Sequence, residues 1–390
     1  LDMQSTAVPI ARHFIRTSGA AGAVNVRKLP GNSRVTLVEF FDSRGNYLSK
    51  GHERKVETAF FREDFHRIDP EDLGAIEYSS RAIEDYQNDF FRLLPAMGPG
   101  RRPRIVCDFG FGSMGSILPG MLGRLGIDAI SINGYNDSKK APRSPHEIAR
   151  HSEHLQQIVS TLGYDFGVLF TNEGERITVV DEAGTVLDGY QMLAVMAGLV
   201  AKTTPNAQIA LSVTAPQNLQ QWLEDQKAKV IRTKSDTRSL MAKAMEPNIA
   251  FAGDNDGGFI FPQLHPGFDS IFAVAQLFSM LQITGCTLRE MVMSLPDFHM
   301  AYQDVRCPWE SKGSVMRRLA ELAGESSNVE TMDGIKINSS QGWVLAIPDS
   351  FEPIVHVYSE GETSADANHL VSSTVTQIEQ LQTESPSVVA

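Results

Sequence analysis

Apolar and polar positions follow two different periods from residue 104 onward. Short apolar runs at 104–109, 127–132 and 166–170 are separated by longer stretches with helical spacing at 115–125 and 146–162. Strands separated by helices of about 10 to 15 residues indicate crossover connections on a largely parallel sheet. We therefore predict an α/β domain in this part of the chain.

The same rhythm begins again after a break at 203–206. Strands are predicted at 209–213 and 229–232, and helices at 217–226 and 237–245. Two consecutive segments of about 100 residues thus share one supersecondary plan, which indicates an internal duplication.

Both ends of the chain depart from this plan. A strand is predicted at 35–41, and strands at 334–337, 343–347 and 354–358 precede a helix that starts near Ala365. Antiparallel strands with a covering helix are typical of a small α+β unit. These changes of pattern predict four segments, with the bounds 1–95, 96–203, 204–310 and 311–390.

Composition excludes several classes of partner. The formal net charge is -12, and an acidic chain is a poor ligand for nucleic acid, which is bound by clustered Lys and Arg. Cys107, Cys286 and Cys307 form no C-x-x-C pair, which favours a reducing compartment and no zinc site. No apolar run approaches the roughly 20 residues of a membrane span. We expect a cytoplasmic protein, and a piece of a longer one, because the text from Leu1 onward has the pattern of mid-domain sequence.

Four phrases resemble, in order, segments of the α-D-phosphohexomutases, the phosphomannomutase and phosphoglucomutase group. They are Arg104–Gly126, Phe170–Leu193, Phe251–Asp269 and Gly342–Glu360, and the second contains the hallmark VVDEAGTVLDGYQ. The resemblance implies successive phosphohexomutase-type mixed-sheet α/β domains plus a small C-terminal α+β domain, with only the second half of domain one represented. It also implies four functional loops around one cleft.

The first of these, the family's phosphoserine loop T-A-S-H-N-P, is replaced in this chain. After Gly22 the sequence continues AVNVRKLPGNS, and Lys28 stands about where the nucleophile would be. Phosphoryl transfer in this family needs a nucleophilic hydroxyl, and the nearest one, Ser33, has surroundings that do not match. The resemblance therefore implies that the catalytic serine is absent.

The metal loop, D-G-D-G-D-R in active members, corresponds to TNEGER at 171–176. Glu173 and Glu175 retain two carboxylates, each one methylene longer than Asp. Mg²⁺ prefers oxygen ligands in near-octahedral geometry, so the resemblance implies a degenerate Mg²⁺ site whose occupancy the longer side chains put in doubt. A solvated acidic turn is the alternative interpretation.

The sugar and phosphate loops have also changed. Asp254, Asn255 and Asp256 replace the family's G-E-x-S-G-H segment and could accept hydrogen bonds from a sugar, or form a plain acidic turn. In place of R-P-S-G-T-E-P the chain has IPDSFEP, where Ser350 keeps a hydroxyl and Asp349 adds a carboxylate that would repel phosphate.

Three cationic residues are further candidates for phosphate contacts. Arg176 matches the Arg that closes the metal motif, and Arg232 and Lys234 match the family's R-T-K segment. Each could equally form a surface or interdomain ion pair.

Four altered loops on an intact scaffold favour a degenerate, regulatory or assembly module over a working enzyme. Phe40–Gly45 and Phe60–Phe65 resemble bacterial proteins that join a mannose-1-phosphate guanylyltransferase to a phosphomannomutase-like segment. That implies a nucleotidyltransferase domain ahead of Leu1, a role in nucleotide-sugar biosynthesis, and a hexose phosphate or nucleotide sugar as ligand. Two alternatives remain: an active phosphomannomutase or phosphoglucomutase, which is an intramolecular phosphotransferase, and a binding protein for a neutral sugar or cation.

Overall fold

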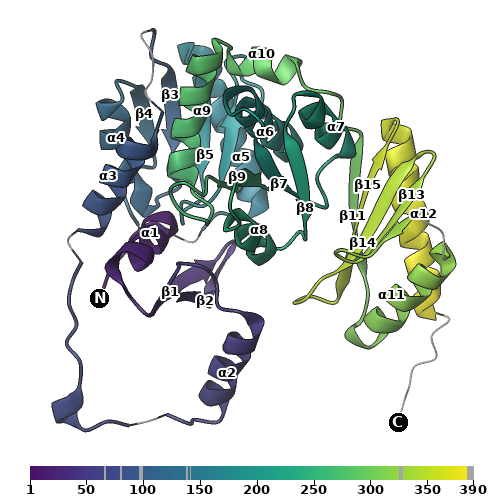
Figure 1. The fold of residues 1–390 in the computed structure, drawn as a ribbon, viewed down its shortest axis with the longest axis horizontal. Helices are drawn as coiled ribbons and strands as arrows, with labels where there is room; N and C mark the ends of the chain where they lie inside the picture. The colour runs from purple at the N-terminus through teal and green to yellow at the C-terminus, as the bar shows by residue number, and fades with distance from the viewer. Residues whose placement is uncertain are drawn as a thin grey trace. The chain divides into compact units, whose positions relative to one another are not determined.

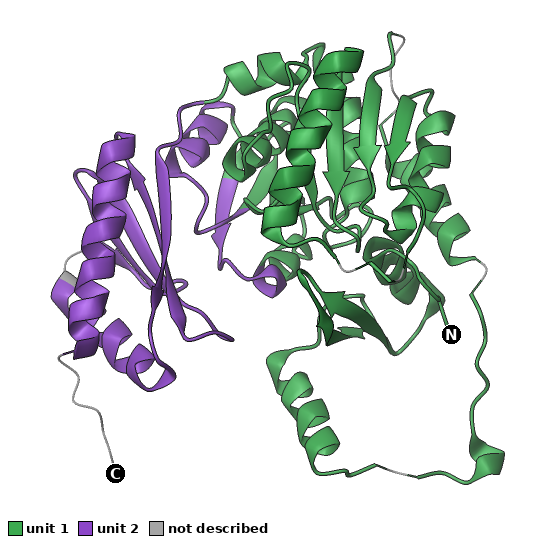
Figure 2. Ribbon diagram, turned by 180° about the vertical axis from the view of Figure 1, so that it is seen from behind, with its two compact units in different colours: residues 1–210, 227–229, 240–295 green, residues 211–226, 230–239, 296–390 purple. Residues whose placement is uncertain are grey.

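Four β-sheets follow one another in the described part of the chain, with helices between and around their strands (Figure 1). The computed structural model describes residues 1–65, 67–79, 81–95, 100–137, 139–140, 142–324 and 328–383. It divides into unit 1, residues 1–210, 227–229 and 240–295, and unit 2, residues 211–226, 230–239 and 296–390 (Figure 2). Mixed-sheet α/β architecture followed by a small antiparallel sheet with a helix confirms the predicted fold class.

The N-terminal part of unit 1 is a hairpin between helices. Its elements are α1 (Val8–Ser18), β1 (Gly22–Leu29), β2 (Asn32–Asp42), α2 (Lys50–Phe61), the 3₁₀ helix η1 (Pro70–Asp72) and α3 (Ala82–Leu93). β1 and β2 pair antiparallel, from Gly22 opposite Asp42 to Leu29 opposite Asn32. The strand predicted at 35–41 is confirmed, but the replaced serine loop is not an open loop. It forms β1 and a tight turn at Gly31, whose φ of +73° suits glycine.

The second sheet has the order β4-β3-β5-β6. Its elements are β3 (Arg104–Asp108), the 3₁₀ helix η2 (Ser113–Ser116), α4 (Leu118–Arg124), β4 (Asp128–Ile132), α5 (Pro145–Leu162), β5 (Phe166–Phe170) and β6 (Ile177–Val180). β3 pairs parallel with β4 and with β5, which confirms the predicted crossover connections, and β6 pairs antiparallel with β5. Leu155 and Val159 of α5 pack against Val106, Leu169 and Val180 of this sheet.

The third sheet has the order β10-β9-β7-β8. The elements here are α6 (Gly189–Thr203), β7 (Gln208–Ser212), α7 (Gln217–Asp225), β8 (Lys229–Thr233), α8 (Thr237–Ala244), β9 (Ile249–Gly253), β10 (Phe259–Ile260), α9 (Ser270–Thr284) and α10 (Leu288–Met293). α6 and α9 contact each other and are apolar nearly all round, as expected of helices buried on every side. In the part of the chain that the structure describes, no helix combines the length and apolarity that a membrane span needs.

Unit 2 contains an antiparallel sheet with the order β11-β15-β14-β13-β12. Its elements are β11 (Met300–Arg306), α11 (Trp309–Ala323), β12 (Val329–Glu330), β13 (Ile335–Ser339), β14 (Gly342–Pro348), β15 (Ile354–Gly361) and α12 (Ser364–Thr383). β14 is apolar on both faces: Val344 and Ala346 pack with α11 and α12, whereas Trp343 and Leu345 belong to a separate cluster. β11 was not predicted as a strand, because only Val305 in it is buried.

A buried hydrogen-bond network links α3 to the start of α9. Asp269 caps α9 by accepting the amide of Phe272 at 2.9 Å, and its Oδ2 accepts the Tyr86 hydroxyl at 2.7 Å. His265 Nε2 lies 3.0 Å from the same oxygen, and its Nδ1 accepts the amide of Gly267 at 3.1 Å, so the proton is on Nε2. Burial lowers the pKa of His265, in keeping with a neutral ring. The network therefore fixes one polar arrangement inside an apolar core.

Replacing Asp269 by Ala is expected to lower the free energy of unfolding by about 3 kcal/mol or more. Tyr86 and His265 would each keep a buried donor without an acceptor, at about 1–3 kcal/mol apiece. Tyr86→Phe removes one donor and should cost about 1 kcal/mol. Urea unfolding followed by circular dichroism measures both, with the exposed Asp72→Ala as control. Equal effects of Asp269→Ala and Asp72→Ala would contradict the role of this network.

Candidate functional site

The acidic turn at 171–176 connects β5 to β6 and presses against the start of α1. Gly174 has a φ of +83°, and a Cβ added to it would lie 2.8 Å from the Met114 sulfur. The amide of Val8 in the first turn of α1 donates to the carbonyl oxygen of Glu173 at 2.9 Å. The same Cβ would lie 3.3 Å from the Cβ of Ala7, which precedes α1, so glycine allows the turn with the two predicted metal ligands to pack closely against the start of this helix.

Arg12 of α1 compensates one of these carboxylates. Its Nη2 donates to Glu175 Oε1 at 3.1 Å, and its Nη1 donates to the carbonyl oxygen of Gly45 at 2.7 Å. The guanidinium carbon lies 4.3 Å from the ring centre of Phe41 and 4.5 Å from that of Tyr47. The Arg12 side chain is 1% exposed, so this ion pair lies in the interior, where a charge without a partner is costly.

Arg27 of β1 lies on the other side of the carboxylate cluster. Its Nε and Nη2 donate to the two oxygens of Glu39, each at 2.9 Å, and its Nη1 lies 3.7 Å from Glu173 Oε1. Asn25 and Tyr47 also donate to Glu39, at 2.8 and 3.2 Å. The bidentate geometry holds the guanidinium in one orientation.

Arginine side chains lie beside both residues predicted to bind Mg²⁺. Guanidinium groups face both Glu173 and Glu175, the predicted ligands. Burial and the charge of Glu175 raise the pKa of Glu173, although Arg27 opposes them. Mg²⁺ needs a near-octahedral set of oxygens, and among the described residues no group of three or more His, Cys, Asp or Glu side chains is placed to hold a metal.

Arg176 contacts the predicted sugar loop. Its Nη1 donates to Asp254 Oδ1 at 2.8 Å and lies 3.9 Å from Asp256 Oδ2, while its guanidinium stacks over Phe268 at 4.7 Å. The amides of Asp256 and Gly258 also donate to Asp254 Oδ1, each at 3.0 Å. The structure thus brings together Arg176, a predicted phosphate contact, and Asp254, a predicted sugar contact. These two side chains form an ion pair with each other.

The hallmark VVDEAGTVLDGYQ builds the frame under this loop. Asp188 and Gln191 form a capping box at the start of α6, in which each side chain accepts the other residue's amide, at 2.8 and 3.1 Å. A Cβ on Gly189 would lie only 1.6 Å from the carbonyl oxygen of Asn255. Only glycine therefore lets the predicted sugar loop contact the start of α6.

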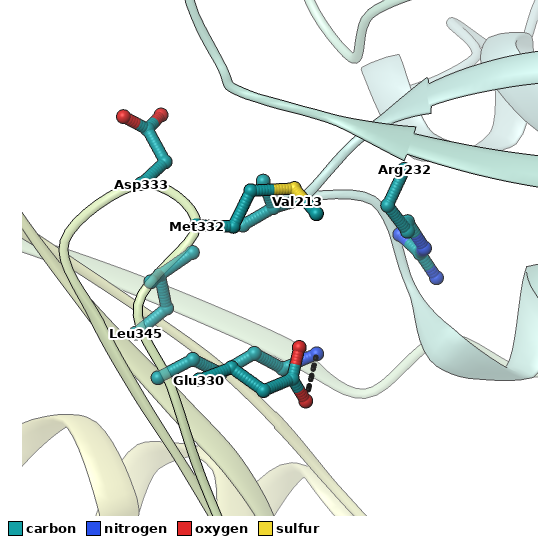
Figure 3. A pocket seen from close by; sticks show the side chains of 7 residues that line it. Val213, Arg232, Glu330, Met332, Asp333 and Leu345 are labelled. Atoms are coloured by element: carbon teal, nitrogen blue, oxygen red, sulfur yellow. Dashed lines mark ion pairs between the residues drawn. The ribbon is translucent and has the colours of Figure 1, made fainter.

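The predicted phosphate contacts Arg232 and Lys234 lie in unit 2. Arg232 donates to the carbonyl oxygens of Ser212, Ala215 and Pro216 at 3.0, 2.7 and 3.0 Å, and burial lowers its pKa to about 10. Lys234 is exposed. Figure 3 shows the small hollow beside Arg232, which is lined by Val213, Arg232, Glu330, Met332, Asp333, Lys336 and Leu345.

An internal carboxylate occupies the amides of the predicted phosphate loop. Asp349 Oδ1 accepts the amides of Phe351 and Glu352, both at 2.6 Å, and its Oδ2 lies 3.1 Å from His356 Nε2. Burial alone would raise the pKa of Asp349, but these hydrogen bonds outweigh it and lower the pKa. Ser350 is exposed between them. Amides that could receive a phosphate thus already bind an anion.

Arg12 and Arg27, the cationic residues beside Glu175 and Glu173, were not predicted from the sequence. A Pro-Gly pair in the replaced serine loop signals a turn, and the resulting hairpin puts Asn25 opposite Glu39 with Arg27 diagonally beside it. That signal could have identified Arg27 and Glu39. Arg12 had no local signal, because its partner Glu175 is 163 residues away.

Comparison with known proteins finds similarity to phosphoglucomutases and phosphomannomutases. Residues 188–298 match the family described as phosphoglucomutase/phosphomannomutase, alpha/beta/alpha domain III. The phosphoglucomutase/phosphomannomutase of Thermococcus kodakarensis is 27% identical over 88% of this chain and 75% of its own length. The phosphoglucosamine mutase of Methanocaldococcus jannaschii is 25% identical over 86% and 75%.

Solved structures show the same fold. A phosphoglucomutase/phosphomannomutase family protein from Burkholderia thailandensis superposes with a TM-score of 0.76 at 18% identity, covering 93% of this chain and 77% of that one. The N-acetylphosphoglucosamine mutase of Aspergillus fumigatus, in complex with GlcNAc-6P and magnesium, gives 0.63 at 14%, covering 97% and 93%. The chain is thus similar in sequence to phosphoglucomutase/phosphomannomutase and phosphoglucosamine mutase relatives, and it shares the fold of the solved structures.

Replacing Arg12 by Met is expected to destabilise the protein by about 3–5 kcal/mol, because Glu175 would remain as a buried charge without its partner. The double variant Arg12→Met with Glu175→Gln removes that charge and should recover part of the loss. Urea midpoints measure both, with the exposed hairpin variant Arg34→Met as control. If the single and double variants unfold at the same midpoint, the ion pair is not the source of the effect.

Proposed function

We propose that this chain is a phosphohexomutase-like module of hexose-phosphate and nucleotide-sugar metabolism that does not itself transfer phosphoryl groups. The observation that carries the proposal is the hairpin turn in place of the serine loop. Lys28, Leu29, Pro30 and Gly31 offer no hydroxyl there. The amide of Gly31 donates to the carbonyl oxygen of Pro142 at 2.9 Å, which holds this turn against the loop before α5.

Two further contacts support the proposal. Asp349 takes the amides of the predicted phosphate loop, so an incoming phosphate would have to displace an internal anion. Arg176 donates to the sugar loop through Asp254. A module that retains the scaffold while its loops bind one another suits a regulatory or assembly role. Its ligand would be a hexose phosphate or a nucleotide sugar, for which the exposed Lys234 offers a cationic contact.

An association with a sugar-1-phosphate nucleotidyltransferase stays a prediction from sequence resemblance. The phrases that carry it, Phe40–Gly45 and Phe60–Phe65, lie in β2 with the turn after it, and in α2 with the residues that follow. α2 has no buried residue, and Phe60 and Phe61 at its end are exposed. Exposed aromatic side chains suit a protein contact, which agrees with an assembly role.

The second candidate function is an active mutase. The names of the relatives favour it more directly than they favour a silent module, since the Thermococcus kodakarensis and Methanocaldococcus jannaschii proteins are both named mutases. In this chain, phosphoryl transfer would need another hydroxyl, and Ser33, which follows the hairpin turn in β2, is the nearest along the sequence.

We expect no mutase turnover from this protein. With mannose 1-phosphate, glucose 1-phosphate or glucosamine 1-phosphate, Mg²⁺ and the matching 1,6-bisphosphate, formation of the 6-phosphate should stay below about 10⁻² s⁻¹, whereas enzymes typically reach about 1–10³ s⁻¹. The Thermococcus kodakarensis relative is the positive control. Turnover that Ser33→Ala abolishes would establish the second candidate and overturn the first.

A further inference from the structure

Two carboxylates lie beside the Arg27 guanidinium, and a third acts on its charge. Glu39 binds it through two oxygens at 2.9 Å, and Glu173 lies 3.7 Å from its remaining nitrogen. Glu175 is close enough to act on its charge, since Glu39, Glu173 and Glu175 all raise the pKa of Arg27 against the effect of burial. The Arg27 side chain is 22% exposed, and those of Glu39 and Glu173 are each 13% exposed. This is a largely buried cluster with one cation facing three anions.

A second cation, Arg12, neutralises part of the negative charge from the interior side of the cluster. Arg12 binds Glu175 at 3.1 Å and is enclosed by the Phe41 and Tyr47 rings. Three carboxylates carry more negative charge than these two guanidinium groups neutralise, and burial and the charge of Glu175 raise the pKa of Glu173. Without the two guanidinium groups, carboxylates this deep would have to take up protons or bind an external cation.

The two kinds of cation make different demands on the same oxygens. A hard divalent ion needs several carboxylate oxygens to converge on one point at about 2.0–2.6 Å. A guanidinium is a planar fork that spreads its donors over separate carboxylates. Here Glu39 and Glu173 approach different nitrogens of Arg27. The side chain that projects between them is thus both the compensating charge and a steric block.

We propose that Arg27 is a built-in counter-ion. Its guanidinium lies between Glu39 and Glu173 where a divalent cation would bind, so part of the negative charge of the cluster is neutralised without metal, and removing Arg27 converts the cluster into a divalent-cation site. The inference concerns cation binding only. It does not rest on the absence of the catalytic hydroxyl, so the two proposals can fail separately.

The test compares Mn²⁺ binding, followed by electron paramagnetic resonance, in the wild type, Arg27→Gln and Arg34→Gln. Arg34 is an exposed arginine of the same hairpin and serves as the matched control. Loss of a positive charge beside the ion should tighten binding by Arg27→Gln at least about tenfold over the wild type, a shift of about 1.4 kcal/mol. Adding Glu173→Gln to Arg27→Gln should abolish the gain, and Mg²⁺ should compete with the bound Mn²⁺.

Each contrary outcome is informative. Wild-type protein that binds Mn²⁺ as tightly as Arg27→Gln, and loses it with Glu173→Gln, would overturn the inference. So would a folded Arg27→Gln variant that binds no better than the wild type. If Arg27→Gln does not fold in buffer alone, millimolar Mg²⁺ should restore its circular dichroism while NaCl of equal ionic strength does not. Failure of that rescue also overturns the inference, whereas the mutase assay is unaffected by any of these results.

Discussion

Buried carboxylates need positive charge within reach, and in unit 1 Glu173 and Glu175 impose this requirement on every element around them. The turn that carries them contacts the first turn of α1, so Arg12 reaches Glu175 from that helix. The hairpin brings Arg27 to Glu173 from the opposite side. Helix, hairpin and turn, which are far apart along the chain, are therefore positioned by one electrostatic condition. Glu173 and Glu175, which the sequence predicts as metal ligands, therefore interact with arginines of the same chain.

The fold was accessible from the sequence wherever burial is periodic. Alternation of strands and helices after residue 104 gave the parallel crossovers of β3, β4 and β5, because both faces of such strands are covered and their residues are apolar. β11 escaped prediction because its sequence is mostly exposed and its strand form depends on pairing with β15. β1, and with it the pairing of β1 and β2 as a hairpin, was missed for a different reason: the family resemblance suggested a loop, and the local Pro-Gly signal was not used.

The site was accessible only in part. Glu173, Glu175 and Asp254 were identified by their place in family phrases, and the structure does bring the metal loop to the sugar loop through Arg176. The sequence does not reveal which side chain each of these groups contacts. An aspartate in a loop could bind a sugar or accept a hydrogen bond from an arginine, and the sequence of the loop is the same in both cases. Pairing across long sequence separations, as for Arg12 and Glu175, is decided by packing alone.

The structural role of Gly189 explains part of the hallmark sequence that contains it. Its contact with Asn255 and the Asp188 and Gln191 cap are demands of backbone geometry, and none of them involves a reacting atom. Even in a protein that has lost catalytic activity, substitution of these residues would disturb the start of α6. The presence of this motif is therefore evidence of a shared fold. It is not evidence of a shared activity.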